Sequence, residues 1–373
     1  MRLRRDLGVR VRRAALVVLV VLGLGELLAR GATVPDAALP PSGYPMDSAI
    51  VLHGNPWLLW ELLPGARKEL GVLVHVNARG FRGPEIGPKQ GARALTLGDS
   101  SIYGFGVEDD EVWSSRLGTT LDVEIVNGAV PGYSTFQALN LLQMRGLALE
   151  PEVLFVGTLW SDNNFDGFVD RELLATYAGW EATPARGVRA VLERSQLFRW
   201  LDWRLRVAPR AAAARKVGWD LSANDRPDGR RRVSIGDYAA NLDRIAGVAR
   251  SRGAAVVYLL PANRDDIDPR GSDPAWTPYR RVLREAAARH GALHVDVPAV
   301  FRASGHTSDA LFLDKMHPTA LGHAFMAEAT AKALATRGWP TTKMAPAVDA
   351  AAAAPPVDRW AHHVVPGNTT APR

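Results

Sequence analysis

The stretch Ala94-Leu95-Thr96-Leu97-Gly98-Asp99-Ser100-Ser101 decides how the rest of the chain is interpreted. Its first half is a short apolar run, which is typical of a strand buried on both faces of a parallel sheet. Its second half is a polar turn, in which Gly98 permits a sharp change of direction. Ligands bind such sheets at the carboxyl ends of the strands. The stretch therefore predicts a buried strand that presents Ser100 there, although a serine in a polar turn is by itself common.

The same alternation of apolar runs and helical patterns continues along the chain. Strands are predicted at 94–97, 123–126, 153–157, 254–260 and 293–297, and helices at 110–121, 135–148, 237–252, 276–290 and 320–336. Strands that alternate with helices favour a parallel sheet covered by helices on both faces. The sequence thus predicts an α/β fold with about five parallel strands.

The composition excludes several classes of function. The chain has 373 residues, of which 47% are hydrophobic and 23% charged, as in ordinary globular proteins. It has no cysteine, which excludes disulfides, thiolate nucleophiles and cysteine zinc sites. The net charge is +6, but residues 1–13 hold six arginines and one aspartate, so the remaining chain carries only +1. A nearly neutral body argues against binding to nucleic acid.

The N-terminal segment has the pattern of an export signal. Residues 14–25 are uncharged and apolar, and they follow the arginines of residues 1–13. This order is typical of a secretory signal or a signal anchor, whereas a buried core helix would not begin with six arginines. A helix needs about 20 predominantly apolar residues to cross a bilayer, so this run is short. It is long enough only if Glu26 and the residues on either side of the run are included. By the positive-inside rule, we expect residues 1–32 to be a signal anchor or signal peptide of an exported envelope protein, held in the inner membrane by one helix.

Three other segments stand apart from the predicted α/β domain, residues 93–338. Residues 33–92 are interpreted as a linker and N-terminal extension, and residues 339–373 as a disordered tail rich in alanine and proline. Residues 165–235 hold no convincing strand and are rich in arginine and tryptophan, ending in a charged loop at 230–232. This helical insertion is a lid, a contact with an anionic membrane, or a peripheral helix with a solvated basic face. Of these three, the peripheral helix is our interpretation, and the acidic residues mixed into the segment argue against binding to nucleic acid.

A candidate base lies far downstream, in Asp314-Lys315-Met316-His317-Pro318. Pro318 suits the first position of a helix, which places His317 at the helix entry, three residues after Asp314. A carboxylate beside an imidazole fixes its tautomer and leaves the other nitrogen free to accept a proton from a serine. Taken alone, however, this segment could equally be a helix cap that happens to contain a histidine. His323 has no paired acid, so we expect it to have a packing or surface role.

Two more polar segments follow the second and third predicted strands. They are Asn127-Gly128-Ala129-Val130-Pro131-Gly132-Tyr133-Ser134 and Gly157-Thr158-Leu159-Trp160-Ser161-Asp162-Asn163-Asn164. A glycine N–H and an asparagine side-chain N–H are suitable donors to an oxyanion. Each segment alone is a common kind of turn. Together with the serine turn and the segment around His317 they make four polar segments in one order along the chain, which is a much stronger indication of an active site.

These four blocks, over about residues 93–338, resemble the SGNH (GDSL-type) hydrolase superfamily. The resemblance implies a three-layer α/β/α sandwich with a flavodoxin-like parallel sheet. It makes Ser100 the nucleophile and first oxyanion donor, Gly132 rather than Gly128 the second donor, and Asp314 and His317 the acid and base. The third block departs from the family pattern: Ser161 and Asp162 stand in the place of an Asn-Asp pair, or Asn163 or Asn164 supplies the donor from a shifted turn. Of these, Asn163 is our prediction.

The implied activity is that of a serine esterase that acts on carboxylic esters through an acyl-enzyme, with no metal or cofactor. Residues 76–85 also look like an upstream motif of membrane-anchored bacterial members. Acyl groups on glycans or lipids are the expected substrates, and the membrane the expected partner. Two alternatives stay open: an envelope polysaccharide O-acyltransferase with the same triad, and a non-catalytic binding module. The sequence leaves the acyl chain and the oligomeric state open.

Overall fold

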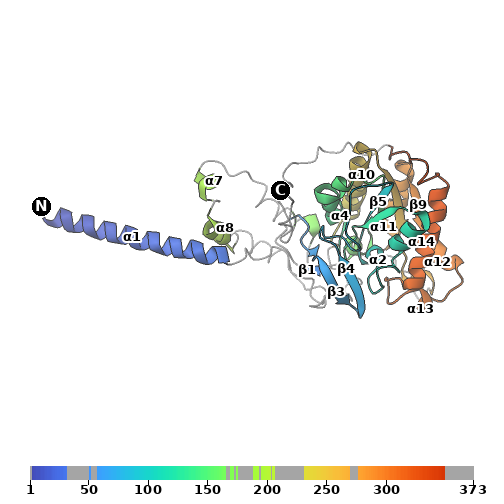
Figure 1. Cartoon of the computed structure of the whole chain (residues 1–373), viewed down its shortest axis with the longest axis horizontal. Helices are drawn as coiled ribbons and strands as arrows, with labels where there is room; N and C mark the ends of the chain where they lie inside the picture. The colour runs from blue at the N-terminus through green and yellow to red at the C-terminus, as the bar shows by residue number, and fades with distance from the viewer. Residues whose placement is uncertain are drawn as a thin grey trace.

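The structure, a computed structural model, describes residues 2–31, 50–51, 57–164, 169–171, 174, 188–192, 195–202, 204–205, 231–268 and 276–348 (Figure 1). The strands are β1 (Ile50–Val51), β2 (Glu61–Leu62), β3 (Gly65–Glu69), β4 (Val72–Val76), β5 (Arg93–Gly98), β6 (Glu124–Asn127), β7 (Val153–Gly157), β8 (Ala255–Leu260) and β9 (Leu293–Asp296). The helices are α1 (Arg2–Gly31), α2 (Ser100–Tyr103), α3 (Trp113–Leu121), α4 (Thr135–Leu141), α5 (Trp160–Asn163), α7 (Val188–Leu192), α8 (Gln196–Asp202), α10 (Ile235–Ser251), α11 (Trp276–Arg289), α12 (Val297–Ala303), α13 (Ser308–Leu311) and α14 (Ala320–Ala335).

The centre of the fold is a parallel sheet of five strands. Their order is β6-β5-β7-β8-β9, and each neighbouring pair is parallel. This is the 2-1-3-4-5 order of flavodoxin-like folds. Every residue of β5, β7 and β8 is buried, as the continuous apolar runs predict. The expected α/β fold and its five-stranded parallel sheet are confirmed.

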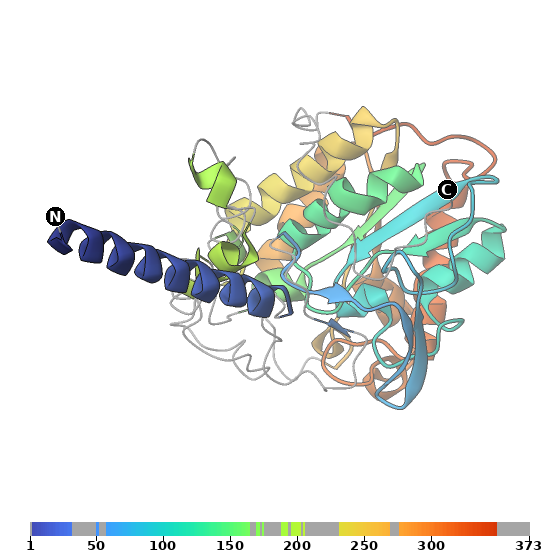
Figure 2. The same ribbon diagram turned by 60° about the vertical axis from the view of Figure 1, so that its left-hand side comes forward.

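Helices cover both faces of this sheet (Figure 2). Helices α3 and α14 pack against each other, and α10 contacts both α4 and α11. The helix predicted at 110–121 begins only at Trp113. Two other boundaries differ from the sequence-based prediction for a clear structural reason. The predicted helix at 135–148 leaves α-helical geometry after Leu141, where a π-helical turn, Leu142–Gly146, follows. Val297 begins α12 instead of ending a strand, because Asp296 caps that helix and Pro298 occupies its first turn.

The segment before the sheet is folded onto the body. Strands β3 and β4 form an antiparallel hairpin, and Trp60 and Phe81 belong to the same hydrophobic core as the sheet. The indole of Trp60 donates to the Pro131 carbonyl at 3.0 Å, and the Tyr133 hydroxyl donates to the Trp60 carbonyl at 2.7 Å. The described part of the predicted linker and N-terminal extension, residues 57–92, therefore packs directly beside the strand ends.

Both ends of the chain differ from the body. Helix α1 extends away from it (Figure 1), and Arg12–Gly31 is long and apolar enough to cross a membrane by length and composition. Helices α7 and α8 fall in the predicted insertion, most of which lies outside the described residues. The predicted disordered tail begins with a packed segment, because Trp339, Met344 and Ala347 are buried among apolar side chains. Residues 349–373 lie outside the described part.

Candidate active site

The turn after β5 presents Ser100 as the first residue of α2. Asp99 caps this helix, since its Oδ1 accepts from the N–H and the hydroxyl of Ser101 at 3.0 and 2.6 Å. Gly98 and Gly157 are register partners at the ends of β5 and β7, and a Cβ on either would lie within 2.7 Å of Ile102. Both glycines are therefore required for α2 to fold back tightly over the sheet.

The same aspartate connects the serine turn to the third polar segment. The second carboxylate oxygen of Asp99 accepts from the N–H groups of Leu159 and Trp160, at 3.3 and 3.0 Å. The carboxylate is fully buried, so its charge is balanced by these N–H groups and by Ser101. Two of the four predicted blocks are thus held at a fixed separation by one side chain.

His317 joins Ser100 to Asp314. Its Nε2 lies 2.8 Å from the Ser100 hydroxyl oxygen, and its Nδ1 lies 2.6 Å from a carboxylate oxygen of Asp314. Ser100 and His317 are 6% and 7% exposed, which leaves a narrow opening to solvent. The ring of Phe105 packs 4.7 Å from the His317 ring, measured between centroids. The structure brings together the three side chains that the sequence selected as nucleophile, base and acid.

Asp314 is held in its charged form. Burial alone would raise its pKa, but hydrogen bonds from the His317 side chain and from the N–H groups of Met316 and His317 outweigh it and lower the pKa to about 2. A carboxylate in contact with Nδ1 places the proton of a neutral imidazole on that nitrogen. Nε2, the nitrogen beside Ser100, is then the proton acceptor.

The second block places Gly132 beside the serine turn. The Val130 N–H donates to the Gly98 carbonyl at 3.1 Å, which ties the two loops together. Gly132 has φ +79°, a conformation that favours glycine, and its carbonyl accepts from Nη1 of Arg232 at 2.7 Å. Within the described chain, neither the Ser100 N–H nor the Gly132 N–H donates a hydrogen bond. Both N–H groups are available to a ligand.

Arg232 is the anchor of this second block. It is fully buried and pairs through Nε and Nη2 with the buried carboxylate of Asp170, each at 2.9 Å. Asp170 also accepts from the Ser134 hydroxyl, and Gln137 accepts from Arg232. Residues 230–232 are interpreted from the sequence as the end of a charged loop, and the structure shows that Arg232 in this run is fully buried. An arginine within a charged run gives no sequence signal of burial, because the partner carboxylate lies 62 residues away.

The third block lies on α5. Asp162 is fully buried and accepts from the N–H and hydroxyl of Thr135, and burial raises its pKa to about 8. The side-chain oxygen of Asn163 accepts from Nη1 of Arg231 at 2.9 Å. The Ser161 hydroxyl is buried and has no hydrogen-bond partner in the described part of the chain. Asn163 and Ser161 thus both remain available as donors.

Two further residues that position the site carried only a weak sequence signal. Arg82 is buried and donates to the carbonyls of Tyr103, Gly104 and Val107, which fixes the end of α2. Asn127 donates to the Tyr103 carbonyl at 3.0 Å from the end of β6. Arg82 lies in the upstream motif at 76–85, but its contacts across the fold were not visible in the sequence.

His323 occupies a separate buried position. It is fully buried on α14, and its Nδ1 accepts from the Trp113 N–H at 3.3 Å. Burial lowers its pKa to about 3, so it is neutral. Its role is packing, as expected for a histidine without a paired acid. Across the described ranges, no group of three His, Asp or Glu side chains is arranged to hold a metal ion.

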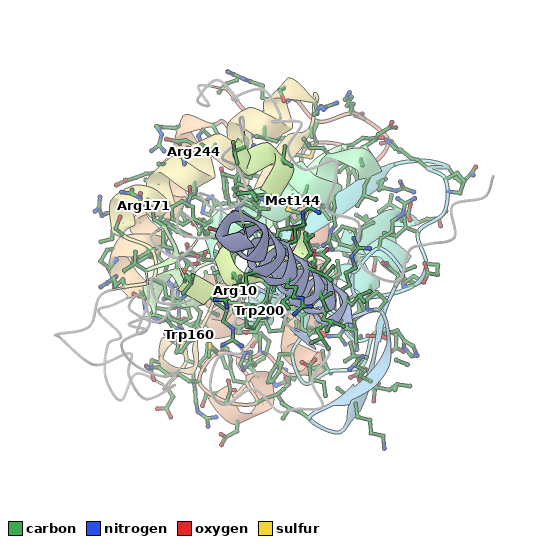
Figure 3. All side chains as sticks on the ribbon, turned by 90° about the vertical axis from the view of Figure 1, so that its left-hand side faces the viewer. Arg10, Met144, Trp160, Arg171, Trp200 and Arg244 are labelled. Atoms are coloured by element: carbon green, nitrogen blue, oxygen red, sulfur yellow. The ribbon has the colours of Figure 1, made fainter. Side chains whose placement is uncertain are left out.

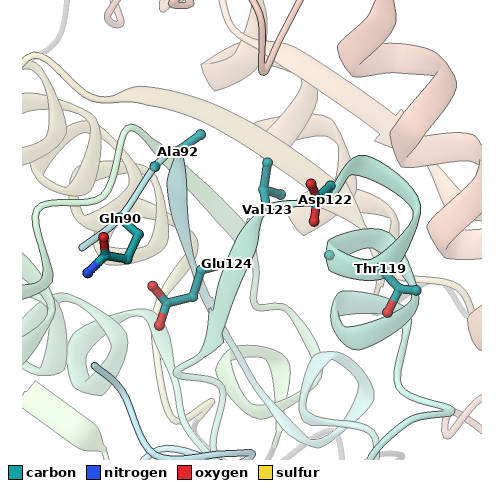
Figure 4. Close-up of a pocket in the computed structure, with 8 residues that line it drawn as sticks. Gln90, Ala92, Thr119, Asp122, Val123 and Glu124 are labelled. Atoms are coloured by element: carbon teal, nitrogen blue, oxygen red, sulfur yellow. The ribbon is translucent and has the colours of Figure 1, made fainter. Parts of the chain in front are cut away.

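One pocket lies away from these residues, at the opposite ends of the strands (Figure 4). It is lined by Ala92 before β5, by Glu124 at the start of β6 and by Thr119 near the end of α3. Ser100 follows the carboxyl end of β5, so the sheet separates the pocket from the candidate site.

A comparison with models of protein families found a match. Residues 156–325 match the model of the GDSL-like Lipase/Acylhydrolase family. This range includes Asn163, Asp314 and His317 and begins after Ser100 and Gly132. The comparison with curated proteins found no match.

The structure is similar to several solved structures at low sequence identity. LAE5, an alpha/beta hydrolase enzyme from the metagenome of Lake Arreo in Spain, is 18% identical over 66% of this chain and 95% of that chain, with a TM-score of 0.44. A putative GDSL-like lipase from Parabacteroides merdae is 14% identical over 68% and 99%, with a TM-score of 0.43. Axe2, an acetylxylan esterase from Geobacillus stearothermophilus, is 15% identical over 65% and 95%, with a TM-score of 0.42. From the family match we conclude that this chain contains a GDSL-like lipase/acylhydrolase domain, of the SGNH/GDSL-type serine hydrolases.

Proposed function

We propose that the protein is a serine esterase that hydrolyses carboxylic esters through an acyl-enzyme. The observation that carries this proposal is the chain of hydrogen bonds from Ser100 through His317 to Asp314. Serine is a weak nucleophile until a neighbouring base accepts its proton. The Nε2 of His317 is within reach of that proton, and Asp314 stabilises the imidazolium that forms.

The reaction then proceeds in two halves. The Ser100 oxygen attacks the ester carbonyl carbon while its proton passes to His317. The tetrahedral intermediate expels the alcohol, which takes the proton from His317 and leaves an acyl group on Ser100. Water, deprotonated by His317, attacks this acyl group, and the acid departs as Ser100 regains its proton.

We assign three donors to the oxyanion of the tetrahedral intermediate. Two are the N–H groups of Ser100 and Gly132, which have no other partner in the described chain. The third is the side-chain N–H of Asn163, because Arg231 holds the amide oxygen and leaves the nitrogen to donate. The unpartnered hydroxyl of Ser161 is the alternative donor. Donors that Arg231 and Arg232 hold in place need little rearrangement during the reaction.

The proposed substrates are acyl groups on glycans or lipids in the cell envelope. Helix α1 supports this location, since Arg12–Gly31 could cross a bilayer and the arginines before it favour a cytoplasmic N-terminus. In this proposal the α/β domain of residues 93–338 lies outside the inner membrane and stays tethered to it by one helix.

The test uses the full chain in detergent. Wild-type protein is expected to react with a fluorophosphonate probe and to hydrolyse p-nitrophenyl esters, with the acyl length varied from acetyl to octanoyl. Ser100→Ala is expected to abolish both, because no other nucleophile in the described part of the chain is paired with His317. Ser115→Ala, at an exposed serine of α3, is the matched control and should leave both unchanged.

Other outcomes would assign a different function. Ester turnover that survives Ser100→Ala would overturn the mechanism. Acyl transfer to an added glycan in preference to water would make the protein an O-acyltransferase with the same triad. Wild-type protein that fails to react with the probe would be a non-catalytic module on this fold.

A further inference from the structure

The anchor helix carries one acidic residue whose contacts bear on the insertion. Glu26 lies within Arg12–Gly31, the candidate span. Its carboxylate accepts from the Ser195 hydroxyl at 2.7 Å and from the N–H groups of Gln196 and Leu197 at 3.1 and 3.0 Å. Arg30, one turn later, donates to it at 3.0 Å. A carboxylate in a membrane helix is costly unless it is paired, and here the start of α8 supplies the donors.

Helix α8 also packs closely against α1. The side chain of Leu197 lies where a Cβ on Gly25 would come within 2.9 Å of it, so the glycine leaves room for the contact. Figure 1 shows α8 beside the carboxyl end of α1, and Figure 3, viewed from the α1 side, labels Trp200 of α8 beside the α1 ribbon. Close packing and a shared carboxylate give α8 a defined position on the anchor.

The length of the apolar run determines the depth of that position. Residues 14–25 rise about 18 Å along a helix, whereas the hydrocarbon core of a bilayer is about 30 Å thick. With Arg13 at the cytoplasmic boundary, Glu26 lies short of the outer boundary. The start of α8, bonded to Glu26, is then level with the outer acyl chains and headgroups.

The outward surface of α7 and α8 suits that environment. It exposes Val188, Val191, Leu192 and Leu201, and Leu205, shortly after α8, is exposed as well. No described residue covers these large apolar side chains. The guanidinium of Arg204 lies 5.1 Å over the Trp200 ring, and Arg199 is on the same helix. Tryptophan favours the membrane interface, and arginine favours anionic headgroups. Apolar, aromatic and basic side chains together are typical of helices that lie in the interface.

We propose that α7 and α8 form a membrane-surface element, which Glu26 of the anchor holds in the outer interface. The partner is the lipid bilayer, because α8 is bonded to the helix that enters it. The arginines of this segment give it a preference for anionic headgroups. This inference rests on the proposed anchor. It replaces the interpretation of the insertion as a solvated peripheral helix for the part that is described.

The absence of cysteine provides a direct test. Single Leu201→Cys, Leu205→Cys and Val348→Cys variants of the full chain are labelled with a nitroxide and reconstituted in vesicles of phosphatidylcholine with phosphatidylglycerol. Leu201 and Val348 are 41% and 52% exposed in the protein, so both labels start as accessible. Collisions with oxygen, which enters lipid, are compared with collisions with a water-soluble nickel chelate.

The labels at 201 and 205 are expected to favour oxygen over nickel at least fivefold more than the label at 348. Equal nickel access at 201, 205 and 348 would overturn the proposal. Magnetic coupling between labels on separate copies would instead indicate that a second copy covers this surface. A label at Leu19→Cys tests whether α1 is inserted in the membrane. If nickel also reaches this label, the proposed anchor is wrong. The esterase proposal is tested separately, since it would be wrong if Ser100 did not react with the fluorophosphonate probe.

Variants at Glu26 test the link itself. Glu26→Ala removes the hydrogen-bond acceptor for the start of α8. The label at position 201 should then become as accessible to nickel as the label at position 348, while the Leu19→Cys label stays in lipid. Glu26→Gln keeps an acceptor oxygen and should retain most of the lipid contact. A 201 label that stays in lipid after Glu26→Ala would show that Glu26 does not hold the element.

Discussion

The two halves of the candidate site are built in different ways. The acid–base half, Asp314 and His317, lies within one loop, and the two residues are three positions apart. The oxyanion half depends on long-range contacts: Gly132 is held by Arg232, which is 100 residues away, and Asn163 by Arg231, 68 residues away. One half is a property of local chain geometry, and the other of the assembled fold.

Because of this difference, variants of the two halves should affect the reaction rate and the stability of the fold differently. The carboxylate of Asp314 is half exposed, so its replacement leaves no buried charge without a partner. Arg232 and Asp170 are both fully buried, and removing one partner of such a pair costs about 3–5 kcal/mol. We therefore expect variants of the acid–base half to fold and lose rate, and variants behind the oxyanion half to lose stability as well.

The largest expected effect is in the acid–base half. Asp314→Asn should lower kcat/KM for a p-nitrophenyl ester by about 10⁴, because an amide no longer keeps the His317 proton on Nδ1. Steady-state kinetics measure the loss, and circular dichroism checks the fold. Asp309→Asn, at an exposed aspartate of α13, is the control and should be silent. A loss below tenfold would show that Asp314 does not orient the base.

The oxyanion half should give a smaller effect in rate. Asn163→Ala removes one donor and is expected to lower kcat by about 10²–10³ with little change in KM. Ser161→Ala, two residues earlier on α5, is the matched variant and should change kcat by less than a factor of about five. If the order of the two losses is reversed, the third donor is the hydroxyl of Ser161.

The smallest effect concerns stability, at His323 in the helix that follows His317. The pKa of His323 is lowered to about 3, below its ordinary value of 6.5, so the folded state takes up its proton at lower pH than the unfolded state. Its contribution to stability is complete above pH 6.5 and is lost as pH falls toward 3. From pH 7 to 5 the loss is about 2 kcal/mol.

Urea unfolding at both pH values measures this loss. His323→Asn keeps an acceptor for the Trp113 N–H and should remove most of the decline. The ester hydrolysis rate of the variant at pH 7 should stay close to that of the wild type, because His323 does not touch Ser100. The same decline in the variant and the wild type would mean that another group is responsible.

Much of the fold followed from apolar runs. All five strands of the central sheet lie within about one residue of their predicted ends, because strands buried on both faces have no polar alternation to obscure them. The resemblance to the SGNH/GDSL superfamily is confirmed by the family match. The ends of parallel strands meet at one edge, and His317 lies in hydrogen-bond contact with Ser100 there, 217 residues apart in sequence. The catalytic and oxyanion roles stay predictions until the variants are measured.

The remaining features could not be derived from periodicity. Arg232 lies in a run of arginines, and only the distant Asp170 explains why it is buried. Glu26 resembles an interruption of an apolar helix until the donors of α8 are seen. In both cases a charged side chain is stabilised by a partner that is far away in sequence, and no local pattern encodes such a pair.

The folded segment before the sheet has a consequence for release of the enzyme from its anchor. A chain shortened to the start of the sheet at residue 93 would lose Trp60 and Arg82, and with them the contacts to Pro131 and to the end of α2. A cut between residues 32 and 49 would keep both, together with the pairing of β1 and β2. A protease that cuts in this stretch would therefore leave the candidate site intact, and the proposed contact of α8 with Glu26 would still hold the enzyme at the membrane. A protease that cuts nearer the sheet would inactivate it.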